Sequence, residues 1–165
     1  MLDLLDEQGR VVGMVRRSEV HGNPSLRHPS VHVFVVNSKG DVFLQRRSDY
    51  KKVQPGKWDT SVGGHIPAGE NYEQGALREL EEELGVTLPD TSRLVRHHDF
   101  VWQTDFETEH TRTFILRYEG PFKLHPAEVS DGRFWTVGEI RASYGRGVFT
   151  PNLELELRNL GIVQA

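Results

Sequence analysis

The spacing of hydrophobic positions changes several times along the chain, and each change predicts an element of structure. Residues 31–36 are almost all apolar and mostly β-branched, which is typical of a strand covered on both faces. The turn-forming residues 37–40 then lead into a second strand and predict a hairpin. Proline and glycine mark 21–30 as a loop, and 48–56 is a polar, basic loop. In all, strands are predicted at 2–6, 11–15, 31–36, 42–46, 58–62, 99–103, 111–118 and 133–137.

A helical period replaces the strand pattern over residues 71–84. Asn71 fits the N-cap, and Gly85 fits the position just past the C-terminal end. The apolar positions fall on one stripe, formed by Ala76, Leu77, Leu80 and Leu84. A closing helix is predicted at 152–160, opened by a threonine and a proline. Strands flanked by two or three helices indicate the α/β class, with a central mixed β-sheet between helices.

Composition narrows the class of protein. At 165 residues, 1–165 is expected to form a single domain with a substantial core. The chain has no long apolar run and its start lacks the pattern of a signal peptide, so we expect no membrane partner and a cytoplasmic location. A net charge of −4 argues against nucleic acid as a partner, and the absence of cysteine excludes a thiol nucleophile.

The predicted helix 71–84 carries an unusual concentration of carboxylates. Glu79 and Glu83 are four residues apart, and Glu82 is three from Glu79, so the three side chains converge on one side of the helix. Like charges at this spacing repel each other. Either the helix presents a solvated acidic face, or a hard cation such as Mg²⁺, or Mn²⁺ in its place, lies among these oxygens.

The residues around this helix fit a longer motif, G-x5-E-x7-R-E-U-x-E-E-x-G-U, in which U is aliphatic. All nine specified positions match: Gly64, Glu70, Arg78, Glu79, Leu80, Glu82, Glu83, Gly85 and Val86. A chance match is improbable, on the order of 10⁻⁹ per window from average residue frequencies. In this motif, hereafter the box, the chain resembles the Nudix hydrolases.

The resemblance implies a Nudix-type α/β/α sandwich with a central mixed β-sheet and metal-dependent hydrolysis of a diphosphate. Glu79 and Glu83 are the first candidates for metal ligands, followed by Glu82, and the resemblance adds the backbone carbonyl at Gly64. Arginine can fork onto a carboxylate and fix its rotamer, so Arg78 and Glu70 are interpreted as catalytic-site residues that orient the others. One of the carboxylates, with Glu79 and Glu82 as the catalytic candidates, or one from a separate loop would act as base for the attacking water, and which one is left open.

Outside the box, basic residues precede the predicted strand 58–62. Arg47 and Lys51 are candidates for binding the diphosphate, and the alternative is an ordinary solvated hairpin end. Glu128 and Asp131 lie where many Nudix proteins carry a further acidic residue, but exposed loop carboxylates are the favoured interpretation.

The resemblance extends over roughly residues 2–140 to the branch that includes isopentenyl-diphosphate isomerases. Those isomerases hold a metal with three histidines and two glutamates, which match His21, His28, His65, Glu107 and Glu109. Whether these residues form a second metal site here is left open. The isomerases also carry a catalytic cysteine two positions before the third histidine.

Here that position is Gly63, which cannot transfer a proton. We therefore predict hydrolysis of a phosphoanhydride bond in a nucleoside diphosphate linked to another moiety, or in a similar small-molecule metabolite. The alternatives are isopentenyl-diphosphate isomerase-like activity and a non-catalytic module that senses a nucleotide. The identity of the substrate and the oligomeric state, a homodimer included, are left open.

Overall fold

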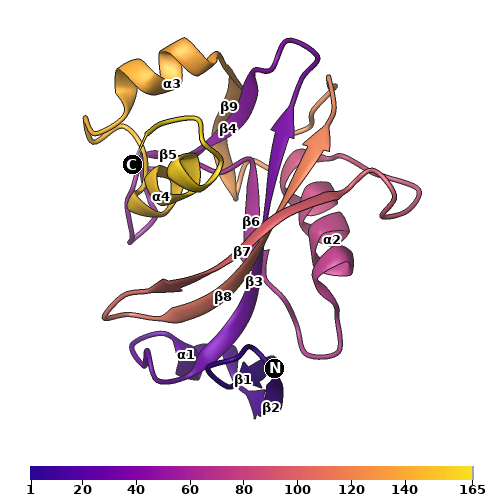
Figure 1. Ribbon diagram of the computed structural model, residues 1–165, viewed down its shortest axis with the longest axis vertical. Coiled ribbons are helices and arrows are strands. Elements are labelled where there is room, and N and C mark those ends of the chain that lie inside the picture. The colour runs from indigo at the N-terminus through magenta and orange to yellow at the C-terminus, as the bar shows by residue number, and fades with distance from the viewer. Residues whose placement is uncertain (165) are drawn as a thin grey trace.

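A mixed β-sheet with helices on both sides organises the chain, as shown by a computed structural model that describes residues 1–164 (Figure 1). Within that range the sheet contains nine strands. They are β1 (Leu2–Leu5), β2 (Val11–Val15), β3 (Arg27–Val36), β4 (Val42–Arg47), β5 (Trp58–Asp59), β6 (Val62–His65), β7 (Val95–Gln103), β8 (Thr108–Arg117) and β9 (Val129–Trp135). The helices are α1 (Arg17–Val20), α2 (Tyr72–Leu84), α3 (Val137–Ser143) and α4 (Pro151–Asn159). The predicted α/β class and sandwich are confirmed.

β3 is the centre of the sheet. It pairs in parallel with β8 along its whole length, and on its other edge it pairs antiparallel with β6 and then with β4. β4 turns away to pair with β5 and β9. β6 therefore has β3 on one edge, and no other strand of residues 1–164 pairs with its second edge.

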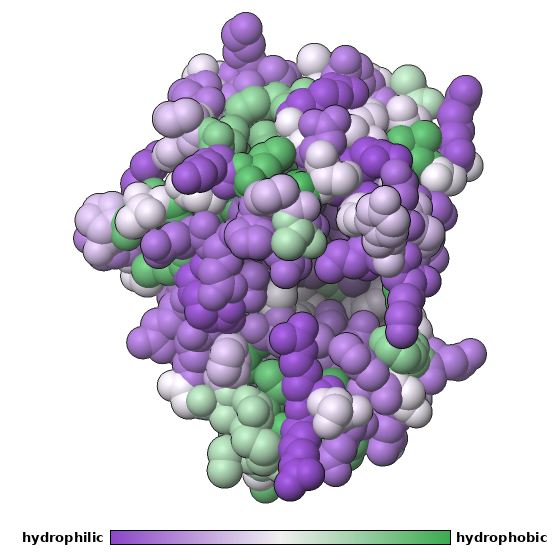
Figure 2. Space-filling model, turned by 180° about the vertical axis from the view of Figure 1, so that it is seen from behind, coloured by the Kyte–Doolittle hydropathy of each residue, from purple (hydrophilic) through white to green (hydrophobic). Residues whose placement is uncertain are grey.

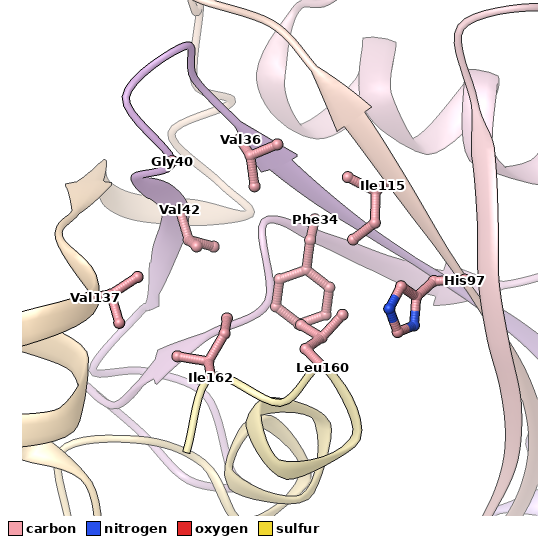
Figure 3. A pocket seen from close by; sticks show the side chains of 9 residues that line it. All are labelled: Phe34, Val36, Gly40, Val42, His97, Ile115, Val137, Leu160 and Ile162. Carbon is pink, nitrogen blue, oxygen red and sulfur yellow. The ribbon is translucent and has the colours of Figure 1, made fainter.

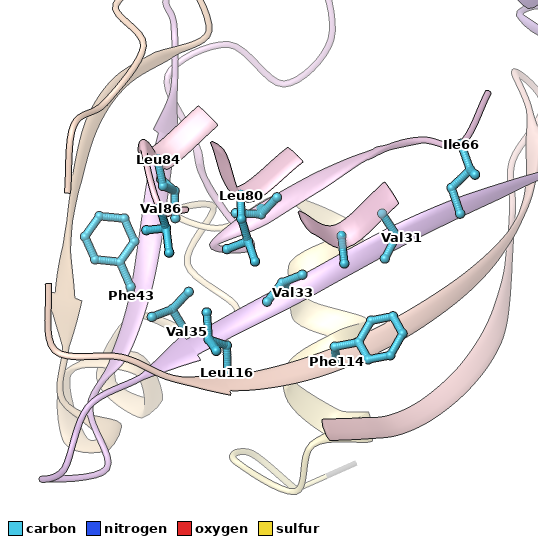
Figure 4. Packing of buried hydrophobic residues seen from close by; sticks show 12 residues of the cluster. Val31, Val33, Val35, Phe43, Ile66, Leu80, Leu84, Val86, Phe114 and Leu116 are labelled. Carbon is cyan, nitrogen blue, oxygen red and sulfur yellow. The ribbon is translucent and has the colours of Figure 1, made fainter. Parts of the chain in front are cut away.

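The core on one face of the sheet explains where α2 lies. Leu80 and Leu84 of the predicted apolar stripe are fully buried against Val33 and its neighbours in β3, as Figure 4 shows. Alternate residues of β3 point to the other face, where Phe34 packs with Leu153 and Leu157 of α4. Burying leucines of this size contributes about 1.5–3 kcal/mol each, which holds both helices on the sheet.

The ends of α2 follow the predicted capping chemistry. The Asn71 side chain accepts a hydrogen bond from the Gln74 backbone N–H at 2.8 Å, and the Gln74 side chain accepts one from the Asn71 backbone N–H at 2.9 Å. Gly85 has a φ of 65°, a left-handed conformation that favours glycine and ends the helix. No helix of residues 1–164 is long and apolar enough to cross a membrane.

Several predicted boundaries were wrong. The strand predicted at 31–36 begins at Arg27, inside the predicted loop, because pairing with β8 extends it. The strand predicted at 58–62 is two strands, β5 and β6, which pair with β4 and β3 respectively. The two helices α1 and α3 were not predicted; both are short, and α3 is opened by a capping box at Thr136.

Candidate active site

The carboxylate of Glu79 lies directly against β6. A Cβ atom at Gly64 would have all three atoms of the Glu79 carboxyl group within 2.9 Å, closer than any side chain could tolerate. A side chain at this position would therefore force the Glu79 carboxylate to move, and the glycine makes no turn, since Gly64 and its neighbour Gly63 lie in the extended strand β6.

Arg78 ties the loop before α2 to the helix. Its guanidinium donates to both oxygens of Glu70 at 3.0–3.2 Å and to Glu79 at 2.7 Å. It also donates to Glu82 at 3.2 Å and to the backbone carbonyl of His65 at 3.1 Å. One planar cation thus fixes the positions of three carboxylates and of the end of β6.

Glu83 is held by a hydrogen bond from β4. The Gln45 amide in β4 donates to its Oε2 at 2.6 Å and also to the carbonyl of Ser61 at 3.1 Å. Burial raises the pKa of Glu83 well above its usual range. The nearby charges of Glu79 and Asp59 raise it further, and the Gln45 hydrogen bond opposes them only in part.

The pKa of Glu79 is raised as well, first by burial and then by the charge of Glu82, against the lowering effect of Arg78. When the ionised forms of two neighbouring carboxylates are both disfavoured, their surroundings contain too little positive charge to balance them. A divalent cation would supply that charge and would return both groups to the carboxylate form. The donor set of Glu79 and Glu83 fits Mg²⁺ or Mn²⁺, which take carboxylate oxygens.

The remaining candidates from the sequence lie further out. Glu82 is more than half exposed, with a side-chain exposure of 58%, and its only side-chain hydrogen bond within residues 1–164 is to Arg78. Arg47 donates a hydrogen bond to the carbonyl of Val53 at 3.0 Å and lies 3.4 Å from Asp59. These contacts stabilise the loop before β5. Lys51 lies 3.6 Å from Glu128 at the surface.

A second cluster of possible ligands forms where the start of β8 meets β3. It contains His28, His65, Glu107 and Glu109, each with one ligand atom within 4.8 Å of the others. His28 and Glu109 are direct register partners in the parallel pair. His21, from the end of α1, places its Nε2 3.5 Å from Oε2 of Glu107. The structure thus brings together all five residues that the isomerase resemblance named.

This cluster has the chemistry of a metal centre. Among the described residues, only five side-chain polar atoms are buried without a hydrogen-bond partner, and they include Nε2 of His28, Nδ1 of His65 and Oε2 of Glu107. Buried polar atoms are normally satisfied, so such a concentration calls for an explanation such as an ion. Imidazole and carboxylate together suit Mn²⁺, Zn²⁺ or Fe²⁺. The residues fit a divalent cation.

Electrostatics in the cluster support the same interpretation. Burial alone would lower the pKa of His65, but the nearby carboxylate of Glu107 and the hydrogen bond to Glu109 outweigh it and raise the pKa to about 9. Burial would raise the pKa of Glu109, yet the histidines around it hold that pKa well below its usual range. Without a metal, the proton on His65 supplies the positive charge that these two carboxylates require.

Two further features describe the surroundings. Figure 2 shows the face of the molecule opposite to the one in Figure 1. This face is hollowed across its middle, at the height of β3 and β6, and mainly hydrophilic residues surround the hollow. An apolar pocket of about 290 Å³ lies apart from the carboxylates, between β3, β4, β8 and the C-terminal residues Leu160 and Ile162 (Figure 3). His97 is the one ionisable residue that lines it. This pocket offers no metal ligand set.

With this geometry established, comparison with known proteins identifies the class. Residues 26–153 match the model of the NUDIX domain, so the chain belongs to the Nudix family. It is 32% identical over 152 residues to an uncharacterized Nudix hydrolase of Yersinia pestis, covering 92% of this chain and 80% of that protein. It is 35% identical over 158 residues to another of Streptomyces coelicolor, covering 92% and 83%.

The predicted relation to the isomerase branch is also confirmed. An isopentenyl-diphosphate Delta-isomerase of Brevibacterium linens is 29% identical over 146 residues, which cover 87% of this chain and 80% of that enzyme. Among solved structures, DR0079 from Deinococcus radiodurans superposes with a TM-score of 0.77 at 28% identity, covering 95% of this chain and 96% of that one.

Three residues that bear on the site were not predicted as site residues. Gln45 of β4 holds Glu83. Asp59 contributes to the raised pKa of Glu83 from β5. Glu156, far along the chain in α4, is buried on the opposite face of the sheet. No local sequence signal marks these residues, because each of them acquires its contacts only through the tertiary fold.

Proposed function

We propose that this protein is a divalent-metal-dependent hydrolase of a phosphoanhydride bond in a nucleoside diphosphate linked to another moiety, or in a similar metabolite. The observation that carries the proposal is the pair of raised-pKa carboxylates, Glu79 and Glu83, gathered at Gly64 by Arg78 and Gln45. The family's hydrolase chemistry supports it.

The chain's own residues have separable parts in this reaction. Glu79 and Glu83 would hold the cation, which when bound neutralises phosphate charge and lowers the pKa of a coordinated water. Arg78 fixes the rotamers of Glu79 and Glu82 before substrate arrives. A carboxylate would accept the proton of the attacking water, and Glu82, exposed and hydrogen-bonded to Arg78, can take that part.

Isomerisation of an isoprenoid diphosphate is the second candidate, because the cluster of His28, His65, Glu107 and Glu109 is assembled as in the isomerase resemblance. Allylic isomerisation needs groups that give and take a proton at carbon. Gly63 supplies none at the position where the isomerases carry cysteine. We therefore favour hydrolysis, and a module that only senses nucleotides is disfavoured by the complete box.

The test is an assay of the purified protein with Mg²⁺ or Mn²⁺ against nucleoside di- and triphosphates, sugar nucleotides, dinucleoside polyphosphates, coenzyme A and isoprenoid diphosphates. We expect a phosphorylated product that forms only with metal and at least one nucleoside diphosphate derivative. Formation of dimethylallyl diphosphate from isopentenyl diphosphate would favour the isomerase instead. Tight binding of nucleotides without any turnover would favour the sensing module.

The His–Glu cluster gives a separate prediction about pH. Because a metal must displace the proton that His65 holds with a pKa of about 9, we expect apparent Mn²⁺ affinity at this cluster to rise with pH from 6.5 to 8.5. The rise should approach about tenfold per pH unit, the limit for release of one proton. Free Mn²⁺ measured by electron paramagnetic resonance reports the affinity. The variant Glu109→Gln should lose this site and keep the one at the box; a pH-independent affinity would contradict the assignment.

A further inference from the structure

A buried carboxylate on α4 takes no part in the chemistry described so far. Glu156 has no exposed surface, yet three side chains hydrogen-bond with it. His98 Nε2 lies 2.7 Å from its Oε1, and Oε2 accepts from the Thr113 hydroxyl at 2.7 Å and lies 3.3 Å from Nδ1 of His32. Burying a carboxylate is unfavourable unless it is fully paired, and apolar residues would fill the space beneath α4 at less cost.

His32 is the member of this group that reaches toward the box. It stands in β3 directly opposite Gly63 of β6. A Cβ atom at Gly63 would lie 3.0 Å from Cδ2 and 3.3 Å from Nε2 of His32, so this edge of the ring covers the glycine. The other nitrogen, Nδ1, is turned toward Glu156. Within residues 1–164 no group forms a hydrogen bond with Nε2, and the side chain keeps 10% of its surface exposed.

His32 and the Glu79 carboxylate of the box lie on opposite faces of β6. Consecutive residues of a strand face opposite sides of the sheet, so Gly64 faces Glu79 and Gly63 faces His32. In the described range no strand pairs with the second edge of β6, and neither glycine has a side chain that would separate Glu79 on one face from His32 on the other. In the arrangement proposed below, the diphosphate lies at Glu79 and the attached group lies past this edge, at His32.

The charges around His32 agree with that placement. Burial lowers the pKa of His32, but the hydrogen bond and charge of Glu156 outweigh it, and the carboxylates of Glu109 and Asp59 add to the increase. Asp59 acts in the same way on Glu83 of the box. The raised pKa favours the imidazolium form of His32, in which Nε2–H is a donor.

We propose that His32, held in place by Glu156, is a specificity-determining residue that donates a hydrogen bond from Nε2 to an oxygen acceptor on the group attached to the diphosphate. The inference rests on the proposed function and narrows it. The attached group is polar, as in a nucleoside or a sugar, because a hydrocarbon placed against Nε2 would exclude water from this donor and leave it unpaired. The diphosphate itself is bound on the Gly64 side.

Equilibrium binding separates this proposal from the hydrolase assignment. Calorimetric titrations with Ca²⁺ in place of Mg²⁺ would use adenosine, uridine, guanosine and cytidine diphosphates, inorganic pyrophosphate and isopentenyl diphosphate. For the nucleoside diphosphate that binds best, we expect His32→Leu to weaken binding at least tenfold, while pyrophosphate changes less than twofold. His32→Gln, which can place an amide donor near the position of Nε2, should restore most of the loss.

The controls decide among the outcomes. His98→Asn removes another partner of Glu156 without touching the face of Gly63, and it should leave nucleotide binding within about threefold. Circular dichroism and thermal melting confirm that each variant is folded. Equal weakening of pyrophosphate and nucleotide, unchanged nucleotide affinity in His32→Leu, or preference of the wild type for isopentenyl diphosphate would each overturn the proposal. Selective loss of nucleotide binding in a protein that hydrolyses nothing would instead overturn only the hydrolase assignment.

Discussion

Replacing Glu83 by glutamine is expected to reduce metal-dependent hydrolysis by about 10²–10⁴-fold, the range for removal of an essential catalytic group. Glutamine keeps the shape of the side chain and can still accept the hydrogen bond that Gln45 donates to Glu83. It removes the negative charge that would hold the cation. Initial rates at saturating Mg²⁺ test the prediction, with Glu81→Gln as the matched control, because Glu81 is exposed on the same helix and lies outside the hydrogen bonds of Arg78.

The same variant is expected to be more stable than the wild type when no metal is present. The pKa of Glu83 is raised in the folded protein, so the folded state binds its proton more tightly than the unfolded state. Wild-type stability therefore falls as pH rises from the unfolded pKa near 4.5 through the raised folded value, and the loss is complete above it. Glutamine does not ionise and avoids this loss.

Thermal melting at pH 7–8 with chelator should thus give a higher Tm for Glu83→Gln, and addition of Mg²⁺ should raise the Tm of the wild type more than that of the variant. Near-normal turnover in the variant would show that Glu83 is not an essential residue of the site. A lower Tm in chelator would contradict the electrostatic account while leaving the catalytic one intact.

Gly64→Ala is expected to have the second largest effect. The new Cβ would overlap the carboxyl group of Glu79 and force it to move. The backbone of β6 is extended there, so alanine itself introduces no strain. Displacement of a reacting group by about 1 Å can reduce the rate about 10²-fold, and we expect at least that loss in kcat.

Gly63→Ala provides the matched control on the other face of the same strand. Its Cβ would approach the ring of His32 at 3.0 Å and leave Glu79 undisturbed. We expect a raised KM for the nucleotide substrate with little change in kcat, since only the attached group would be affected. Steady-state kinetics of the two variants distinguish these effects. Equal losses of kcat in both would indicate a general distortion of β6, and an unchanged kcat in Gly64→Ala would contradict the placement of Glu79.

Much of the fold could be predicted from the sequence where the signals are local. The boundaries of α2 are set by Asn71 and Gly85, whose capping chemistry operates within one helical turn. The early start of β3 at Arg27 depends instead on β8, about eighty residues later in the chain. Likewise, the break between β5 and β6 reflects pairing with two different strands. The strand propensity of a local sequence does not reveal which distant strand it pairs with.

The residues of the site also differ in whether a local sequence pattern could predict them. Glu70, Arg78, Glu79 and Glu83 lie in one contiguous segment, so the spacing of the box alone predicted that they act together. The cluster around Glu109 could be named only through the family resemblance, because its ligands come from three separated segments. Gln45 and Glu156 had no such signal. Each is an ordinary polar residue of an amphipathic element until the fold shows what it contacts.

The parallel register of β3 with β8 also determines when the His–Glu cluster can form during folding. Ser30 and Glu109, which hydrogen-bond across this pair, are separated by 79 positions, so the chain must close a long loop before the ligands meet. Contacts of this kind slow folding. A slip of one residue would also turn Glu109 away from His28. Metal capture at this cluster is therefore expected as a late event, and the time course of metal uptake after dilution from denaturant would report the completion of the central sheet.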